Sequence, residues 1–184
     1  MKFIKTDIPS LVIIEPTVFA DARGYFLESY NKKAFEENIG SVNFVQDNES
    51  KSSKGVLRGF HFQKPPFTQA KLVRCIEGEV LDVAVDIRRG SPTYGKHISV
   101  KLTGENKKQL FVPRGFAHGF AVLSKTAVFA YKVDNIYAPK YDGGIIWNDT
   151  DLQIDWNLSE NEVKLSEKDA KLPTLASLDN PFIY

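Results

Sequence analysis

The stretch EVLDVAVDIRR, residues 79–89, shows the clearest alternation of apolar and polar side chains in the chain. Leu81, Val83, Val85 and Ile87 occupy every second position, and charged residues stand at most of the positions between them. Successive side chains of a strand point to opposite faces, so the pattern predicts a strand with one apolar face. Such a strand has to bury that face against another layer of structure.

Further short strands are expected on both sides of this stretch. The preceding residues, KLVRCIEGE (71–79), end in the turn signal Glu77-Gly78, so we predict that they form a hairpin with 79–89. Strands are also predicted at residues 97–103, 109–112, 118–123 and 126–133, with turns at 104–106 and 124–125. Many short strands separated by turns are typical of an antiparallel sandwich or barrel.

Two segments have helical patterns, one towards each end of the chain. NKKAFEENIG (31–40) has apolar residues at helical spacing and stops at Gly40, and LSEKDAKLP (165–173) begins with Ser166 as a cap. We therefore expect an all-β fold, a jelly-roll β-barrel or sandwich with a few short helices near its ends. Because 184 residues suffice for one core, we expect one domain spanning residues 1–184. Such barrels leave a cavity between their sheets, so polar residues inside strands are candidate site residues.

Composition excludes several kinds of partner. The 24 Lys and Arg residues balance 23 Asp and Glu residues, so no nucleic-acid footprint is expected. Cys75 is the only cysteine, which excludes an intrachain disulfide and favours a reducing compartment. The apolar run LVII near the N-terminus is too short for a signal sequence or a membrane span. We expect a cytoplasmic protein with neither a membrane nor a nucleic-acid partner.

His61 and Lys71 are polar residues within predicted strands. His61 stands between two phenylalanines in GVLRGFHFQ (55–63), where Gly59 indicates a bulge that would let Arg58 and His61 reach one cavity. Taken alone, the stretch favours a hydrogen-bonded core histidine. Lys71 shares a strand face with Val73, so an inward ammonium would need an anionic partner. An edge-strand lysine that discourages aggregation fits the pattern equally well.

His118 lies in FVPRGFAHGFAVLS (111–124), where a histidine after a turn could be a metal ligand. The chain has only three histidines, and no His-x-His pair is followed by a carboxylate at ligand spacing, which argues against a metal. A site of two histidines completed by distant carboxylates stays open. The third histidine, His97, begins a polar strand and is expected to be exposed.

Tyr131 and Asp169 each admit two interpretations. A tyrosine holds its proton at neutral pH and can donate it to a carbanion, although a strand tyrosine more often only packs its ring. Ser166 and Asp169 have the spacing of a capping box, which the sequence alone favours. Alternatively, Asp169 orients a histidine elsewhere and fixes its tautomer.

Taken together and in order, these motifs resemble the dTDP-4-dehydrorhamnose 3,5-epimerase family. The resemblance extends from about residue 3 to 175 and is carried by RGYFLESY (23–30), FVQDNES (44–50), GVLRGFHFQ (55–63), QAKLVRC (69–75), FVPRGFAHGF (111–120), the Tyr131 strand, IIWNDTDLQIDW (145–156) and LSEKD (165–169). It implies a cupin-type jelly roll, a homodimer, and no metal or redox cofactor. It also implies inversion of C3 and C5 of dTDP-4-dehydro-6-deoxy-glucose on the route to dTDP-L-rhamnose.

The resemblance also implies roles for individual residues. His61 would be the base, Asp169 its orienting partner, Lys71 the stabiliser of the enolate and Tyr131 the acid on the far face. The residues expected to bind the dTDP-sugar are Arg23, Phe26, Glu28, Gln46, Asp47, Asn48, Arg58, Lys71, His118, Asp142 and Lys168. The family often has Glu where Asp142 stands and Arg where Lys168 stands, so these two contacts are less secure.

Three other functions remain as alternatives. A relative that inverts only C5 or C3 would carry a similar set of residues. A non-catalytic cupin would bind a nucleotide sugar and use His61 only as a structural residue. A metal-dependent cupin enzyme would use His61 and His118 as ligands.

Overall fold

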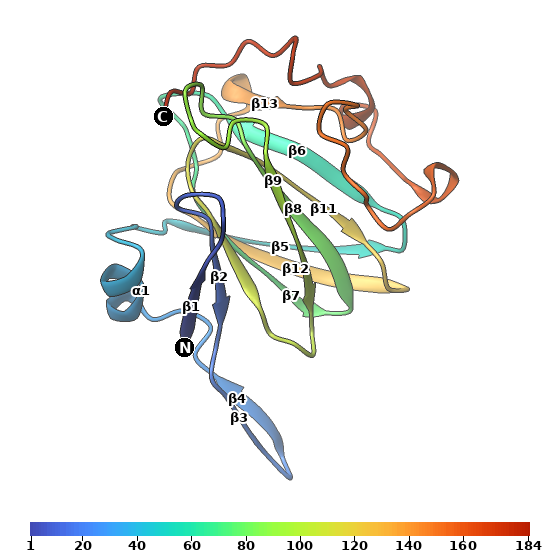
Figure 1. Cartoon of the computed structure of the whole chain (residues 1–184). Coiled ribbons are helices and arrows are strands. Elements are labelled where there is room, and N and C mark those ends of the chain that lie inside the picture. The colour runs from blue at the N-terminus through green and yellow to red at the C-terminus, as the bar shows by residue number, and fades with distance from the viewer.

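Two antiparallel sheets lie face to face in the computed structural model, which describes residues 1–184 (Figure 1). The six-stranded sheet has the order β1 (Lys2–Lys5), β2 (Val12–Glu15), β10 (Gln109–Val112), β7 (Lys71–Glu77), β12 (Thr126–Val133) and β5 (Gln46–Ser53). The five-stranded sheet has the order β13 (Asp142–Gly144), β6 (Leu57–Gln63), β11 (Phe116–Val122), β8 (Glu79–Asp86) and β9 (His97–Thr103). This double-sheet, all-β architecture confirms the predicted fold class.

The remaining elements are small. A separate hairpin pairs β3 (Val18–Asp21) with β4 (Gly24–Leu27), and α1 spans Lys32–Asn38. Three single 3₁₀ turns follow at Pro139–Tyr141, Glu160–Glu162 and Asp169–Lys171. No helix is long and apolar enough to cross a membrane.

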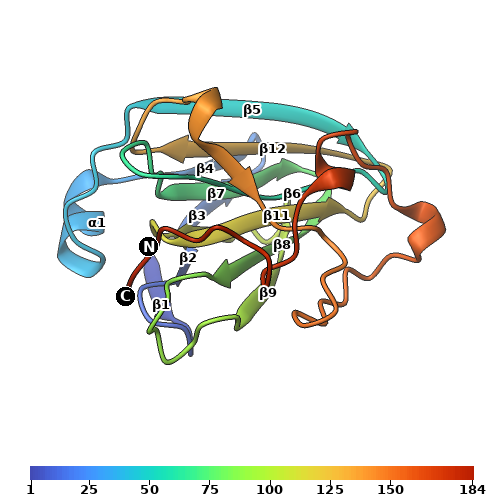
Figure 2. The ribbon, with the colours of Figure 1, turned by 90° about the horizontal axis from the view of Figure 1, so that it is seen from above.

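Three apolar clusters hold these layers together. The first lies between the sheets and includes Val73, Leu102 and Phe129, with the rings of Phe120 and Phe129 stacked 4.1 Å apart. The second lies outside the five-stranded sheet, where the C-terminal segment covers it with Trp156 and other apolar side chains. In the third, α1 packs on the outer face of the six-stranded sheet (Figure 2). Both sheets are therefore covered on their outer faces over part of their area.

The predicted hairpin of residues 71–79 and 79–89 is wrong. β7 pairs with β10 and β12, whereas β8 pairs with β11 and β9, so the two strands belong to different sheets. Gly78 has φ +82° and lets the chain pass from one sheet to the other, because a Cβ there would lie 2.1 Å from the Thr126 carbonyl oxygen. A turn signal between two strands indicates a reversal but does not specify their hydrogen-bonded neighbours.

β8 is also more buried than its alternation predicted. All residues from Val80 to Asp86 are buried, and Asp82 and Asp86 are 0% exposed. The apolar side chains face the C-terminal segment on one side, while Asp82 faces inwards and Asp86 lies at the end of the strand. His97, predicted to be exposed, is half-buried at the start of β9.

The helix predicted at residues 31–40 is confirmed as α1. Asn31 caps it by accepting the Ala34 N–H, and Gly40 follows its end with φ +118°. The helix predicted at 165–173 is wrong, because only one 3₁₀ turn forms there. Ser166 Oγ does accept the Asp169 N–H at 3.1 Å, as a cap would. The reciprocal bond of a capping box, from the Ser166 N–H to the Asp169 carboxylate, does not form, and the carboxylate is bonded to His61 instead.

The predicted strands at 97–103, 109–112 and 126–133 are confirmed, with the predicted first and last residues. The strand predicted at 118–123 runs instead from Phe116 to Val122.

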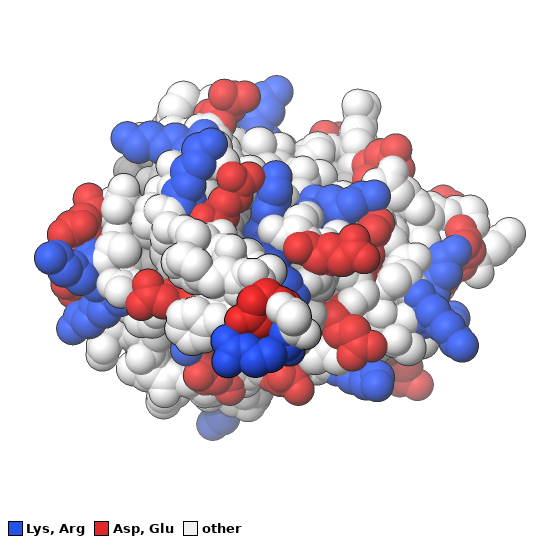
Figure 3. Space-filling model, turned by 90° about the horizontal axis from the view of Figure 1, so that it is seen from below, with Lys and Arg blue, Asp and Glu red and all other residues white.

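Acidic and basic side chains are interspersed over the face seen in Figure 3, with no large patch of one sign.

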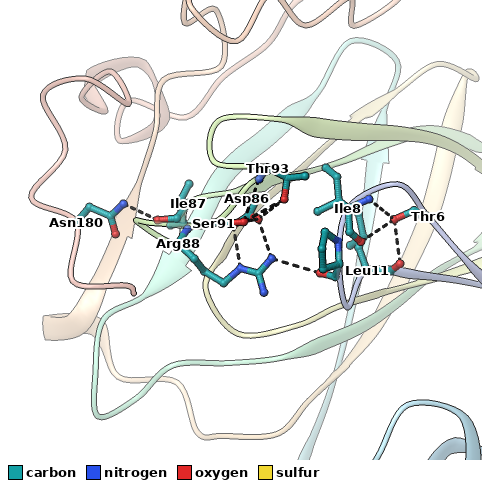
Figure 4. A network of polar contacts seen from close by, with 10 residues as sticks. Thr6, Ile8, Leu11, Asp86, Ile87, Arg88, Ser91, Thr93 and Asn180 are labelled. Atoms are coloured by element: carbon teal, nitrogen blue, oxygen red, sulfur yellow. Dashed lines mark hydrogen bonds and ion pairs between the residues drawn. The ribbon is translucent and has the colours of Figure 1, made fainter. Parts of the chain in front are cut away.

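Asp86 is the centre of a polar network that ties distant parts of the chain together (Figure 4). Its carboxylate accepts hydrogen bonds from Arg88 Nη2 at 2.7 Å, Ser91 Oγ at 2.6 Å and Thr93 Oγ1 at 2.7 Å. Arg88 also donates to the Pro9 carbonyl near the N-terminus and lies over the ring of Tyr184 at the C-terminus. Burial raises the pKa of Asp86, but these donors outweigh it and lower the pKa overall.

Replacing Asp86 by Ala should therefore destabilise the fold by about 3 kcal/mol, because Arg88 is left buried without its partner. Urea or thermal unfolding measures the change. In the wild-type protein, the lowered pKa means that Asp86 stabilises the fold above its unfolded pKa of 3.8 and stops doing so as pH falls through the lower folded value. Asp179→Ala, which removes an exposed partner of Lys64, is the control and should leave the midpoint unchanged. Equal midpoints for the two variants would contradict the role given to Asp86.

Candidate active site

A cavity of about 630 Å³ opens between the two sheets. Its wall includes His61 from β6, Lys71 from β7, Tyr131 from β12 and Asp169 from the C-terminal segment. A smaller hollow of about 130 Å³ shares His61, Lys71 and Tyr131 and is also lined by Asp142. The four residues predicted to be catalytic therefore line one space, although they come from four separate parts of the chain.

The bulge predicted at Gly59 is present. Gly59 has φ +122°, and a Cβ on it would lie 2.6 Å from the Gly119 Cα, so the strands β6 and β11 approach closely here. The register of this pair shifts between His118 and Phe120. As a result, Arg58 and His61 both line the cavity instead of following strict alternation.

His61 and Asp169 form a hydrogen-bonded pair across 108 positions of sequence. The distance from His61 Nε2 to Asp169 Oδ1 is 2.7 Å, and the Gly59 N–H donates to Oδ2 at 3.4 Å. Asp169 is 4% exposed. Burial raises the pKa of its carboxyl, but the hydrogen bonds that it accepts and the charge of His61 together outweigh burial and lower the pKa overall. The carboxylate therefore stays ionised. An ionised carboxylate can only accept a hydrogen bond, so Nε2 of His61 holds a proton. In the neutral ring, Nδ1 then has the free lone pair.

Lys71 presents its ammonium to the cavity without a close counter-ion. Burial lowers its pKa from 10.5 to about 8, and the carboxylates of Asp142 and Asp82 oppose this shift through charge alone. The ammonium is therefore still largely protonated at neutral pH, with donors available to a ligand.

Tyr131 keeps its proton in this environment. Burial raises the pKa of its phenol, and the positive charge of Arg58 offsets only part of that shift. The ring lies 6.3 Å from that of Phe129 in the apolar cluster between the sheets. A phenol with a raised pKa is a proton donor rather than a base at neutral pH.

His118 is also in the cavity wall, and a buried carboxylate lies behind it. Its Nε2 is 2.9 Å from Asp82 Oδ2 and 3.1 Å from Oδ1. Strand pairing sets His118 opposite His61. Asp82 was not predicted as a site residue because its place in an alternating stretch suggested a solvent-facing aspartate. The sequence feature that could have indicated Asp82 is its charge within a strand, because β8 is buried on both faces.

Five of the other predicted binding residues line one of these two spaces. Asn48, Arg58 and Lys168 line the main cavity, and Gln46 and Asp142 line the smaller hollow. Lys168 forms an ion pair with Asp142, so the two residues that depart from the family pattern contact each other. Burial lowers the pKa of the Lys168 ammonium, but the bond to Asp142 outweighs it and raises the pKa overall.

Four predicted binding residues line neither the main cavity nor the smaller hollow. Asp47 pairs with Lys132 at 2.8 Å and lines a separate hollow of about 280 Å³ on the outer face of the six-stranded sheet. Arg23 and Phe26 lie on the β3–β4 hairpin, which projects away from the sheets, and Glu28 follows directly after it (Figure 1). The Arg23 side chain is 90% exposed and bonded to Asp21, and Phe26 is 65% exposed.

Tyr137, in the loop after β12, is a neighbour of the site that the sequence patterns did not single out. Its hydroxyl donates to Asp142 Oδ2 at 3.2 Å, and it lines the smaller hollow with His61 and Lys71. Nowhere do three or more His, Cys, Asp or Glu side chains form an arrangement that could hold a metal ion.

Comparison with known proteins gives one consistent family. The dTDP-4-dehydrorhamnose 3,5-epimerase family model matches residues 5–177. A dTDP-4-dehydrorhamnose 3,5-epimerase from Shigella flexneri is 56% identical over 170 residues, which cover 92% of this chain and 93% of the relative.

Two solved structures extend the comparison to the fold. The dTDP-4-dehydrorhamnose 3,5-epimerase from Elizabethkingia anophelis superposes with a TM-score of 0.94 at 56% identity, covering 98% of each chain. An epimerase from Legionella pneumophila, solved in complex with dTDP-4-keto-L-rhamnose, has a TM-score of 0.93 at 52% identity, covering 97% of this chain and 94% of that one. The predicted cupin-type jelly roll is thereby confirmed. The chain belongs to the dTDP-4-dehydrorhamnose 3,5-epimerase family.

Proposed function

We infer that the chain inverts C3 and C5 of dTDP-4-dehydro-6-deoxy-glucose and so forms dTDP-4-dehydro-L-rhamnose. The observation that carries this inference is the His61–Asp169 pair in the wall of a cavity that also holds the Lys71 ammonium and the Tyr131 phenol. Both carbons flank the C4 ketone, so each carries an acidified C–H bond. Inversion removes that proton to give an enolate and returns a proton to the opposite face.

His61 is proposed as the base. Because Asp169 engages Nε2, the lone pair of Nδ1 is the one that can accept a substrate proton. The carboxylate then stabilises the imidazolium that forms. Asp169 acts through His61 and is a positioning residue in this scheme.

Lys71 and Tyr131 are proposed to complete the proton transfer. The Lys71 ammonium lacks a close counter-ion, which suits it to the negative oxygen of the enolate. The Tyr131 phenol retains its proton and can deliver it to the carbanion face away from the base. These steps transfer only protons and change no oxidation state, so they need no redox cofactor. The Lys71 ammonium is proposed to stabilise the enolate oxygen, a task that a metal ion performs in other enzymes.

The nucleotide end of the substrate is proposed to lie against Arg58, Gln46 and Asn48. The planar guanidinium of Arg58 suits the diphosphate because it can bond two oxygens at once. His118, Asp142 and Lys168 are proposed to close the pocket around the sugar nucleotide. The Asp47 side chain lies on the outer face of its sheet, so Asp47 is proposed to contact the substrate through its backbone.

We further propose that the protein is a homodimer in which the β3–β4 hairpin of one protomer reaches the cavity of its partner. All eight residues of the two strands except Leu27 are exposed, including Phe19 at 61% and Phe26 at 65%. A two-stranded hairpin with exposed aromatic residues is marginally stable in water, so a partner surface would stabilise it. Arg23, Phe26 and Glu28 would then bind substrate in the neighbouring protomer.

The chain is proposed to work as one domain in the cytoplasm. The lone cysteine, Cys75, is buried and needs no oxidising environment. The product, dTDP-4-dehydro-L-rhamnose, is proposed to be the precursor of dTDP-L-rhamnose for the assembly of cell-surface polysaccharide.

Incubating the enzyme with dTDP-4-dehydro-6-deoxy-glucose in D₂O should place deuterium at both C3 and C5, as NMR of the product would show. His61→Ala should slow this exchange by about 10²- to 10⁴-fold, because the base is lost. dTDP should still bind to the variant, since the phosphate and thymine contacts remain. His97→Ala is the matched control, because His97 is a half-buried histidine outside the cavity.

Each competing function has its own outcome in this experiment. Deuterium at C5 but never at C3, or the reverse, would identify an epimerase of a single centre. Exchange that is unchanged in His61→Ala would contradict the catalytic role of His61. Exchange that disappears after treatment with a chelator would support a metal-dependent enzyme instead.

The pH profile of kcat/KM should fall above about pH 8, because the Lys71 ammonium, with a pKa of about 8, loses its proton there. Lys71→Arg should lower the maximum but move this alkaline limb upward, since a guanidinium stays protonated to above about pH 12. Tyr131 does not produce the limb, because its pKa lies above the ordinary value of 10. The same alkaline limb in Lys71→Arg and the wild-type enzyme would assign it to another group.

Mixing two inactive variants should restore activity if the hairpins are exchanged. His61→Ala damages the cavity and Arg23→Ala damages the hairpin, so a mixed dimer contains one cavity and one hairpin that are both intact and belong to the same site. Subunits are mixed, allowed to exchange, and assayed for turnover against each variant alone. If Arg23 served its own cavity, both sites of the mixed dimer would be defective, and no recovery would be seen.

A further inference from the structure

A second imidazole–carboxylate pair, His118 and Asp82, lies at the cavity wall, and the proton transfers proposed above do not use it. His118 Nε2 contacts both oxygens of Asp82, at 2.9 Å and 3.1 Å. The side chains of His118 and Asp82 are 7% and 0% exposed, so water competes little with this contact. The pair uses the same ring nitrogen as the His61–Asp169 pair.

Strand geometry holds the two partners in place. His118 is in β11, the strand between β6 and β8, and Asp82 is in β8, where it pairs with Phe120. Asp82 is therefore diagonal to His118 across adjacent strands, within reach of its ring. His118 lines the cavity, whereas Asp82 lies behind it and does not. Any effect of Asp82 on a ligand must pass through another residue.

The Asp82 carboxylate determines which ring nitrogen of His118 carries the proton. An ionised carboxylate accepts hydrogen bonds and cannot donate them, so Nε2 must carry a proton. This leaves Nδ1 as the ring nitrogen that can contact a molecule in the cavity. A buried carboxylate requires such a donor or a nearby positive charge, and the Lys71 ammonium supplies the latter.

We propose that Asp82 is a positioning residue that fixes the tautomer and the ring plane of His118, so that Nδ1 meets the bound nucleotide sugar. The proposal rests on the proposed function, because it takes the cavity to be the site of that substrate. Asp82 and Asp169 then do the same task for two histidines that lie opposite each other on neighbouring strands. One histidine is oriented for proton transfer and the other for binding.

The tautomer can be measured without substrate. The chain has only three histidines, so ¹⁵N-labelled histidine gives a spectrum in which His97→Asn and His61→Ala assign two of the rings and leave His118. His118 should carry its proton on Nε2 in the neutral ring. A wild-type spectrum with the proton on Nδ1 alone would overturn the proposal, whatever the enzyme's activity.

Asp82→Asn tests the effect on function. The amide can donate as well as accept, so it no longer imposes one tautomer, and the Nδ1–H form of His118 should appear. Loss of such an orienting partner should lower kcat/KM by about tenfold. The matched control is Asp149→Asn, which alters a buried carboxylate bonded to the Leu175 N–H, away from the cavity. It should leave the His118 tautomer unchanged and kcat/KM within twofold.

Different outcomes would contradict the role of Asp82 and the proposed function. An Asp82→Asn protein that folds, keeps the Nε2–H tautomer and retains kcat/KM within twofold would overturn the role of Asp82. Wild-type protein that exchanges no substrate hydrogen would overturn the proposed function, while the His118 spectrum would still report on Asp82. Should Asp82→Asn fail to fold, the wild-type spectrum decides the tautomer.

Discussion

The hydrogen bond between His61 and Asp169 is the contact on which the site depends. It joins the middle of a sheet to a segment 108 residues further along the chain. That segment is held by apolar packing, in which Trp156 and Phe182 cover the outer face of the five-stranded sheet. The bond from Asn180 to the Ile87 carbonyl fixes its end. Packing that stabilises the fold therefore also sets the position of the Asp169 carboxylate beside His61.

The buried carboxylates of the chain all accept hydrogen bonds, whereas the Lys71 ammonium in the cavity is an exception among the charged groups. Asp82, Asp86 and Asp169 each have a cationic or imidazole partner within hydrogen-bond distance, and Asp149 accepts the N–H groups of Asp151 and Leu175. Lys71 has no such partner, and burial disfavours its charged form. An ammonium of this kind is incompletely compensated until an anionic group enters the cavity. The enolate oxygen of a ketosugar would supply that group, which makes the exception understandable as part of a site.

Most local patterns in the sequence predicted local structure correctly, although the helix predicted at 165–173 does not form. The helix at 31–40, the strand at 126–133 and the bulge at Gly59 depend on neighbouring residues, and all three are present. The pairing of β7 with β10 and β12 depends on contacts between distant residues, which no turn signal encodes. Likewise, the burial of Asp82 results from the way the sheets and the C-terminal segment enclose β8, and an alternating stretch cannot indicate it.

The site residues show the same division. The local sequence favoured a core role for His61 and a cap for Asp169, and only their order with other motifs suggested a pair. The position of Arg23 could not be predicted, because the direction in which the β3–β4 hairpin leaves the sheets does not depend on the hairpin's own residues (Figure 1). Residues whose role lies within one strand are thus easier to identify than residues that depend on contacts between distant parts of the chain.

In the proposed mechanism, a single set of groups is sufficient for inversion at two carbons because both carbons flank the same ketone. Lys71 can stabilise one oxygen in either enolate, so the second inversion needs no second oxyanion site. His61 and Tyr131 must, however, approach C3 and C5 in turn, which requires the sugar to shift while the nucleotide stays bound. The difference between double and single inversion therefore depends less on the catalytic residues than on how firmly contacts such as Arg58 and His118 retain the intermediate between the two steps.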